Sequence, residues 1–124
     1  MPQVLILDDD PDRHKAFRKI LSDCERYHAY TDLEAFSFLE HYGPFELVCL
    51  DHDLGNFSVG ESLPLGDLAG SGIDVAEYIA LHLEKEKYPK KIIIHSWNAP
   101  GALRMFRILF PTGIPITTIP FKAP

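Results

Sequence analysis

Two groups of acidic residues directly follow short apolar runs, and these groups are the part of the chain best suited to chemistry. They are Asp8-Asp9-Asp10 and Asp51-His52-Asp53. Carboxylates brought together on neighbouring strands repel one another unless a cation offsets them. Hard oxygen ligands of this kind suit Mg²⁺, which binds one or two carboxylates and keeps several waters. The pattern therefore indicates a site for Mg²⁺ or Mn²⁺ at Asp8, Asp9 and Asp51; the alternative is acids that cap helices and face solvent, the only role expected of Asp10.

The elements that must position these acids alternate between strand and helix along the chain. Apolar runs predict five strands, at 4–7, 27–30, 45–50, 91–94 and 114–119. Helix-start signals lie between them at Asp10-Pro11, at Thr31 with Glu34, and at Ser71 with Asp74. A turn at 99–101 is expected to lead into a fourth helix, and Pro115 and Pro120 confine the last strand to a sheet edge.

The expected buried helix faces follow from apolar spacing. They are Phe17, Ile20, Leu21 and Cys24 in the first helix, Leu33, Phe36 and Leu39 in the second, Val75, Ala76, Ile79, Ala80 and Leu83 in the third, and Leu103, Phe106 and Phe110 in the fourth. Four histidines are expected on the surface: His14, His28, His41 and His82.

The fold class predicted from this alternation is α/β, a doubly wound parallel sheet of five strands in the order 2-1-3-4-5. Residues 1–124 are expected to form a single domain in which a fifth helix is missing, because the sequence stops where it would begin. In such sheets ligands bind beyond the carboxyl ends of the strands, at the switch between the first and third. Both acidic groups fall at those ends.

Composition narrows the choice of partners and compartment. The net charge of −6 argues against binding along an extended nucleic-acid backbone, although a nucleotide or an RNA end could bind in a local pocket with a metal. No apolar run approaches the ~18–20 residues of a membrane span, and no signal peptide is recognisable. With only Cys24 and Cys49, disulfides are not expected, and a reducing cytoplasm is the expected location.

The runs "VLILDDD" and "ELVCLD" resemble the response-regulator receiver domain. That resemblance implies a receiver- or flavodoxin-like fold, Mg²⁺ bound by Asp8 and Asp9, and Asp51 as the counterpart of the phosphoryl-accepting aspartate. Receivers end their last strand with Lys followed by Pro, whereas this chain has Ile119-Pro120-Phe121-Lys122, and the stretch from His52 to Gly70 is long.

Four motifs together look like a narrower group, the cyclic-phosphate-processing receiver family. They are "DDDPDRHKAF", "LDHDLG", "GSGIDVAEYI" and "HSWNAPGA". The resemblance implies action on a cyclic phosphate such as an RNA 2′,3′-cyclic end. It carries functional roles to nine positions: Asp8, Asp9, Arg13, Asp51, His52, Asp53, His95, Ser96 and Asn98.

Hydrolysis of a cyclic phosphodiester needs a base, an acid and positive charge near the phosphoryl oxygens. We therefore expect His52 and His95, with Asp51, to be catalytic. The metal set becomes Asp8, Asp9, Asp51 and Asp53, and the substrate set is Arg13, Ser96 and Asn98. Because side chains alternate along a strand, Asp51 and His52 cannot both enter one crevice unless the chain has left the strand, and the same holds for His95 and Ser96.

Two other functions stay open. The chain could be a stand-alone receiver that is phosphorylated and acts through a partner, or a protein that binds a cyclic nucleotide without turnover. The loop at 54–70 is expected to be a lid over the site, a dimer contact or an ordered flap.

Overall fold

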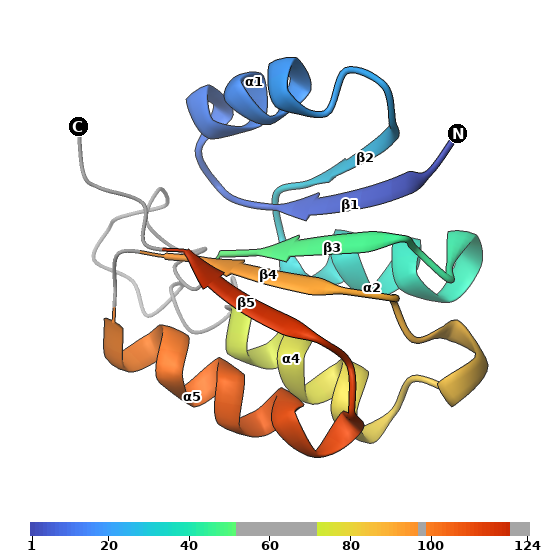
Figure 1. The fold of residues 1–124 in the computed structure, drawn as a ribbon, viewed down its shortest axis with the longest axis vertical. Coiled ribbons are helices and arrows are strands. Elements are labelled where there is room, and N and C mark those ends of the chain that lie inside the picture. The colour runs from blue at the N-terminus through green and yellow to red at the C-terminus, as the bar shows by residue number, and fades with distance from the viewer. Residues whose placement is uncertain (52–71, 97–98, 120–124) are drawn as a thin grey trace.

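The structure is a computed structural model, and it describes residues 1–51, 72–96 and 99–119. Five parallel strands form one sheet in the order β2-β1-β3-β4-β5. Their bounds are β1 Gln3–Leu7, β2 Glu25–Ala29, β3 Leu47–Leu50, β4 Ile92–His95 and β5 Ile116–Ile119. Figure 1 shows β1, β3, β4 and β5 running in one direction, with their arrowheads at the same edge of the sheet. The predicted strand order is confirmed.

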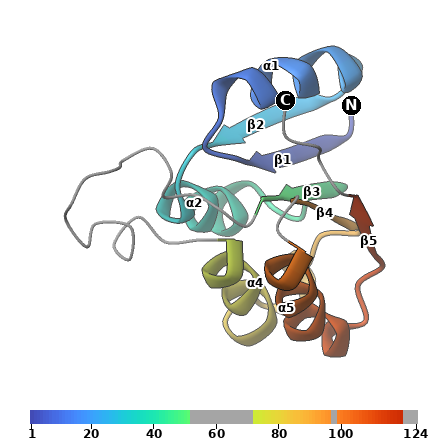
Figure 2. The same ribbon diagram turned by 90° about the vertical axis from the view of Figure 1, so that its left-hand side faces the viewer.

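Four α-helices cover the two faces of the sheet in the described part of the chain. They are α1 Pro11–Ile20, α2 Asp32–Tyr42, α4 Gly72–Leu81 and α5 Ala99–Leu109, with short 3₁₀ turns η1 Lys85–Lys87 and η2 Phe110–Thr112. Helix α1 lies on one face, and α2, α4 and α5 lie on the other (Figure 2). The prediction that no fifth helix follows β5 concerns residues 120–124, which lie outside the described residues.

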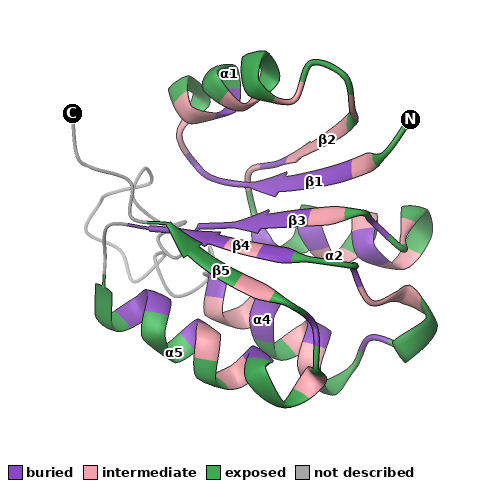
Figure 3. Ribbon diagram, viewed as in Figure 1, coloured by how far each residue is buried: buried purple, intermediate pink, exposed green. Residues whose placement is uncertain are grey.

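Side-chain alternation along the strands divides the core into a large and a small cluster. Leu5, Leu7, Val48 and Leu50 point toward α2, α4 and α5 and belong to the large cluster, whereas Val4, Ile6 and Cys49 point toward α1. Figure 3 shows β1 and β3 buried over most of their length, and β5 largely exposed, as a central and an edge position require. The edge placement of the last strand is confirmed.

The helix starts confirm two predicted caps. The Asp10 side chain accepts the backbone N–H of Asp12 at 2.9 Å, and the Thr31 hydroxyl accepts that of Glu34 at 3.2 Å. Ser71 lies outside the described residues. The predicted turn at 99–101 is wrong, because α5 already begins at Ala99; Pro100 is tolerated in a first turn, where its missing N–H would have no helical partner.

Several predicted helix-face positions are wrong, although Leu39, Val75, Ala76 and Ile79 are buried as predicted. Ile20, Leu33, Leu103 and Phe110 are exposed. Helix α5 buries Gly101, Ala102, Met105 and Leu109 in their place, so small residues let it lie close to the sheet. In α2 the buried positions include Ala35 and Leu39, and in α4 they include Val75, Ala76 and Ile79.

Cys24 and Cys49 are both free thiols, as expected. Among the residues that the structure describes, no helix combines the length and the apolar character that crossing a bilayer requires.

Candidate metal centre

Strand register brings three chemically active residues into one row. Leu7 pairs with Leu50, and Leu50 pairs with Ile94, so the next residues along β1, β3 and β4 are Asp8, Asp51 and His95. Because Leu7, Leu50 and Ile94 face the large core, the side chains that follow them point to the α1 face. One carboxylate oxygen from each aspartate and one imidazole nitrogen lie within 4.8 Å of one another. All three residues are buried, with 0%, 3% and 1% of their surface exposed.

Arg13, in the first turns of α1, places a cation against this row. Its Nε lies 2.7 Å from Asp8 Oδ2, and its terminal nitrogens lie 3.5 Å from Asp51 Oδ2, 3.7 Å from Asp9 Oδ1 and 3.4 Å from Asp10 Oδ2. Burial works against the guanidinium charge, but the hydrogen bond to Asp8 and the charges of Asp51 and Asp10 together raise the pKa of Arg13 above its ordinary value. One positive charge from within the chain therefore offsets part of the negative charge of the buried carboxylates.

The backbone around Asp8 and Asp51 holds both carboxylates in place. Asp8 donates its N–H to the Ala29 carbonyl at 3.1 Å, and its Oδ1 accepts the N–H of Asp10 at 2.8 Å. Asp51 donates its N–H to the Leu7 carbonyl at 3.0 Å. Gly72 passes so close to Asp51 that a Cβ atom at this position would lie 2.0 Å from the Asp51 carbonyl oxygen, so the start of α4 requires glycine.

His95, the third member of the row, lies beneath α1. Its Nδ1 lies 3.5 Å from Asp8 Oδ2, and its ring packs against Phe17 with centroids 5.0 Å apart. Burial lowers the pKa of His95 to about 4, so its imidazole is neutral at pH 7. A neutral imidazole can ligate a metal, but a ring covered by α1 is poorly placed to exchange protons with a substrate. The catalytic role given to His95 stays a prediction that its burial disfavours.

A histidine pair that was not predicted from the sequence lies behind the acids. The prediction that His14 lies on the surface is wrong. His14 is fully buried, because it occupies the inner side of α1 above β1 and β2. Its Nε2 lies 2.8 Å from the Asp8 carbonyl, its Nδ1 lies 2.7 Å from His28 Nδ1, and its ring stacks on Tyr30 at 4.0 Å. A carbonyl only accepts, so His14 Nε2 carries the proton and, with both rings neutral, His14 Nδ1 accepts from His28 Nδ1–H.

This pair is kept uncharged by its surroundings. Burial lowers the pKa of His14, and burial with the neighbouring His14 lowers the pKa of His28 to about 4. No motif signal marked the pair, since the two residues are linked only by the packing of α1 on β2.

Some of the remaining predicted site residues lie in the described part of the chain, and the others lie outside it. Asp9 is buried beside Arg13, whereas Asp10 is partly exposed and caps α1. Ser96 is buried and its N–H is 3.3 Å from the Ile119 carbonyl. His52, Asp53 and Asn98 lie outside the described residues, as do Lys122 and the loop expected to act as a lid.

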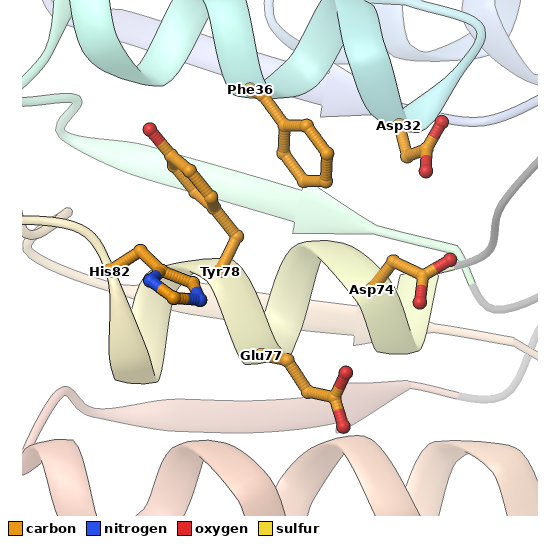
Figure 4. Close-up of a pocket in the computed structure, with 6 residues that line it drawn as sticks. All are labelled: Asp32, Phe36, Asp74, Glu77, Tyr78 and His82. Carbon is orange, nitrogen blue, oxygen red and sulfur yellow. The ribbon is translucent and has the colours of Figure 1, made fainter.

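A second acidic region lies between α2 and α4, on the other face of the sheet. A cavity of about 360 Å³ is lined there by Asp32, Phe36, Asp74, Glu77, Tyr78 and His82. Figure 4 shows Phe36 and Tyr78 between the two helices, and the carboxylates of Asp32 and Asp74 at one end. Burial and the charge of Asp74 raise the pKa of Asp32, so the charged form of this side chain is less favourable in the folded protein than in water.

The two aspartates and the histidine of the row suit a divalent ion. Their donor atoms lie within the reach of one ion, and the acids are already positioned against a cation, the guanidinium of Arg13. The residues present therefore fit a divalent ion, the class of ligand that the receiver resemblance implies.

Comparison with known proteins identifies a family for most of the chain. Residues 3–110 match the family described as the cyclic-phosphate processing receiver domain. No curated protein matches the chain.

Solved structures of receiver proteins share the fold. A CheY-like response regulator receiver domain protein from Methanospirillum hungatei JF-1 superposes with a TM-score of 0.69 at 19% identity, covering 100% of this chain and 84% of that one. A response regulator from Burkholderia pseudomallei, with a phosphorylated aspartic acid, a calcium ion and citrate, gives 0.68 at 16%, covering 100% and 62%. NtrX from Brucella abortus gives 0.65 at 21%; the match covers 98% of this chain but only 24% of NtrX.

Proposed function

The chain belongs to the cyclic-phosphate processing receiver domain family, and from this premise we propose that it is a metal-dependent phosphoesterase that opens a cyclic phosphate. The substrate class is a nucleotide cyclic phosphate or an RNA 2′,3′-cyclic end. The observation that carries the proposal is the convergence of Asp8, Asp51 and Arg13 at the carboxyl edge of the sheet, where two buried carboxylates meet a guanidinium. Cytoplasmic location is part of the same proposal.

Each residue has a task that its chemistry supports. Asp8, Asp9 and Asp51 would hold Mg²⁺ or Mn²⁺, with Asp53 as a further ligand from outside the described residues. When bound, the ion supplies positive charge to phosphoryl oxygens and lowers the pKa of a bound water. Arg13 offers a planar fork of donors that can hold two phosphate oxygens at once.

The acid–base work falls to the residues around this centre. His52 is the predicted proton donor or acceptor, because the burial of His95 keeps that ring from the substrate. Ser96 and Asn98 are the predicted contacts to the remaining phosphate or ribose oxygens. Net charge of −6 confines the substrate to a short ligand, since an extended phosphate backbone would be repelled.

A second function is favoured by one feature, the position of Asp51. It ends β3 beside Asp8, and the Burkholderia pseudomallei relative carries a phosphorylated aspartic acid and a calcium ion. By that likeness the chain could accept a phosphoryl group on Asp51 and act through a partner. Binding of a cyclic nucleotide without turnover is the third possibility.

Phosphorus NMR separates the three functions in one series. The protein is incubated with Mg²⁺, which is diamagnetic, and a panel of nucleoside 2′,3′- and 3′,5′-cyclic phosphates, and then with acetyl phosphate. We expect a cyclic phosphate signal to convert into a monoester signal, and Asp51→Asn to abolish the conversion. Line broadening without conversion would contradict hydrolysis in favour of binding. A lasting phosphoryl adduct, absent in Asp51→Ala, would contradict it in favour of signalling.

A further inference from the structure

We propose that His95 is itself a ligand of the bound ion, so that the site selects a first-row transition ion such as Fe²⁺, Co²⁺, Ni²⁺ or Zn²⁺ over Mg²⁺. The inference rests on the metal site of the proposed function and names its ligand set and its class of ion.

The first support is the placement of the imidazole in the row. His95 stands at the same register level as Asp8 and Asp51, on three neighbouring strands and on the same face of the sheet. A ring nitrogen and one oxygen from each carboxylate fit within 4.8 Å of one another. An ion held by both carboxylates at this level therefore lies beside the ring.

The second support is the orientation of the ring. His95 Nδ1 is 3.5 Å from Asp8 Oδ2, the same oxygen to which Arg13 Nε donates. Phe17 packs against the ring, with the two ring centroids 5.0 Å apart. The ring is thus held with its nitrogen toward the acids before any ion arrives.

The third support is the burial of the donor atoms. Mg²⁺ gives up its waters reluctantly and favours sites with one or two carboxylates and several waters. Asp8, Asp51 and His95 expose 0%, 3% and 1% of their surfaces, so this end of the row offers little room for a hydrated ion. Transition ions accept a nitrogen donor readily and tolerate fewer waters, and their affinity for mixed nitrogen and oxygen sites rises from Mn²⁺ toward Cu²⁺.

Arg13 must then change its partner when the ion binds. Its Nε and the ion compete for Asp8 Oδ2, which the guanidinium holds at 2.7 Å. Release from Asp8 leaves the guanidinium free to take phosphate oxygens, so one side chain serves as counter-ion without the metal and as substrate contact with it.

Cobalt provides the test, because a histidine bound to Co²⁺ gives a paramagnetically shifted imidazole N–H resonance. The metal-free protein is titrated with Co²⁺ and, separately, with Mg²⁺, while affinity is measured by calorimetry and the resonance by proton NMR. We expect tighter binding of Co²⁺ than of Mg²⁺ and one shifted resonance. His95→Asn should lose the resonance and weaken Co²⁺ binding by at least the roughly 10–100-fold that loss of an outer-shell partner costs, with a smaller effect on Mg²⁺.

His82→Asn is the matched control, because His82 is an exposed histidine in the α2–α4 cavity, on the face of the sheet away from the row. It should keep the resonance and both affinities. Absence of a shifted resonance in the Co²⁺-loaded wild type overturns the inference, and this result needs no variant to fold. Equal Mg²⁺ and Co²⁺ affinities, unchanged in His95→Asn, overturn it too but leave the metal site of the proposed function standing. Binding of neither ion contradicts both.

Discussion

Two acidic regions of this small domain differ in how their carboxylates are arranged. In the row on the α1 face, Asp8 and Asp51 come from neighbouring strands and point at the same small volume, where Arg13 contacts both. Between α2 and α4, Asp32 and Asp74 come from the first turns of two helices and line an open cavity with Glu77 (Figure 4). Three acidic residues are therefore present in each region, counting Asp9 with the first.

The difference indicates that geometry, and not the number of acids, decides whether carboxylates can share one ion. Strands 4.7–4.9 Å apart that share a register bring carboxylates into the reach of one ion, whereas helix surfaces spread them along a groove. The row is also buried and partly compensated by a cation, whereas the described residues that line the groove include no lysine or arginine. Removing the positive charge from the row should therefore lower the stability of the protein, whereas removing a carboxylate charge from the groove should raise it.

The largest expected effect comes from removing the cation of the row. Arg13→Ala leaves buried carboxylates at Asp8, Asp9 and Asp51 without the guanidinium, and breaking a buried ion pair costs about 3–5 kcal/mol. We expect the metal-free variant to lose stability in urea unfolding and to regain part of it with Mn²⁺, with a larger metal-induced rise in Tm than the wild type. Equal stability of the two proteins without metal would show that the guanidinium does not offset the row.

A smaller effect is expected from the histidine that supports the row. His14→Phe keeps an aromatic ring but removes the N–H that the Asp8 carbonyl accepts and the Nδ1 that accepts from His28, and each unsatisfied buried group costs about 1–3 kcal/mol. His14→Gln can place an amide N–H at the position of Nε2 and should recover part of the loss. Urea unfolding measures both variants. If glutamine is no better than phenylalanine, the hydrogen bond to Asp8 is not what His14 contributes.

The strand order and the end of the sheet that carries the acids were predictable from sequence, because a buried strand is a continuous apolar run and parallel strands end at one edge. The grouping of Asp8, Asp51 and His95 into one row was not predictable from the sequence. Alternation left open whether His95 or Ser96 shares a face with Asp51, and only the register of β3 and β4 decides for His95. His14 could not be found either, because α1 carries several side chains able to face the sheet and the choice depends on the angle at which it packs.

The smallest effect is expected in the groove. Because burial and Asp74 raise the pKa of Asp32 in the folded protein, the folded state holds that proton more tightly than the unfolded chain. The charged carboxylate therefore lowers stability at neutral pH, and this penalty disappears as the pH falls through the folded pKa. Asp32→Asn should raise stability by about 0.5 kcal/mol at pH 7 and by less in acid.

Unfolding curves at several pH values test this prediction. The amide oxygen of asparagine can still accept the Leu33 N–H that Asp32 Oδ1 accepts at 2.8 Å, so the variant isolates the charge. A loss of stability at pH 7 would mean that the Asp32 carboxylate is favourable where it stands, and that the two acidic regions are less different than proposed.

The central claim, that the row and not the groove holds the ion, is tested most directly by calorimetric titration of Mn²⁺ into three proteins. These are the wild type, Asp51→Asn in the row and Asp74→Asn in the groove. We predict one site in the wild type, a loss of about 100-fold in affinity for Asp51→Asn, and an unchanged affinity for Asp74→Asn. An Asp51→Asn protein that binds Mn²⁺ as tightly as the wild type would contradict the claim.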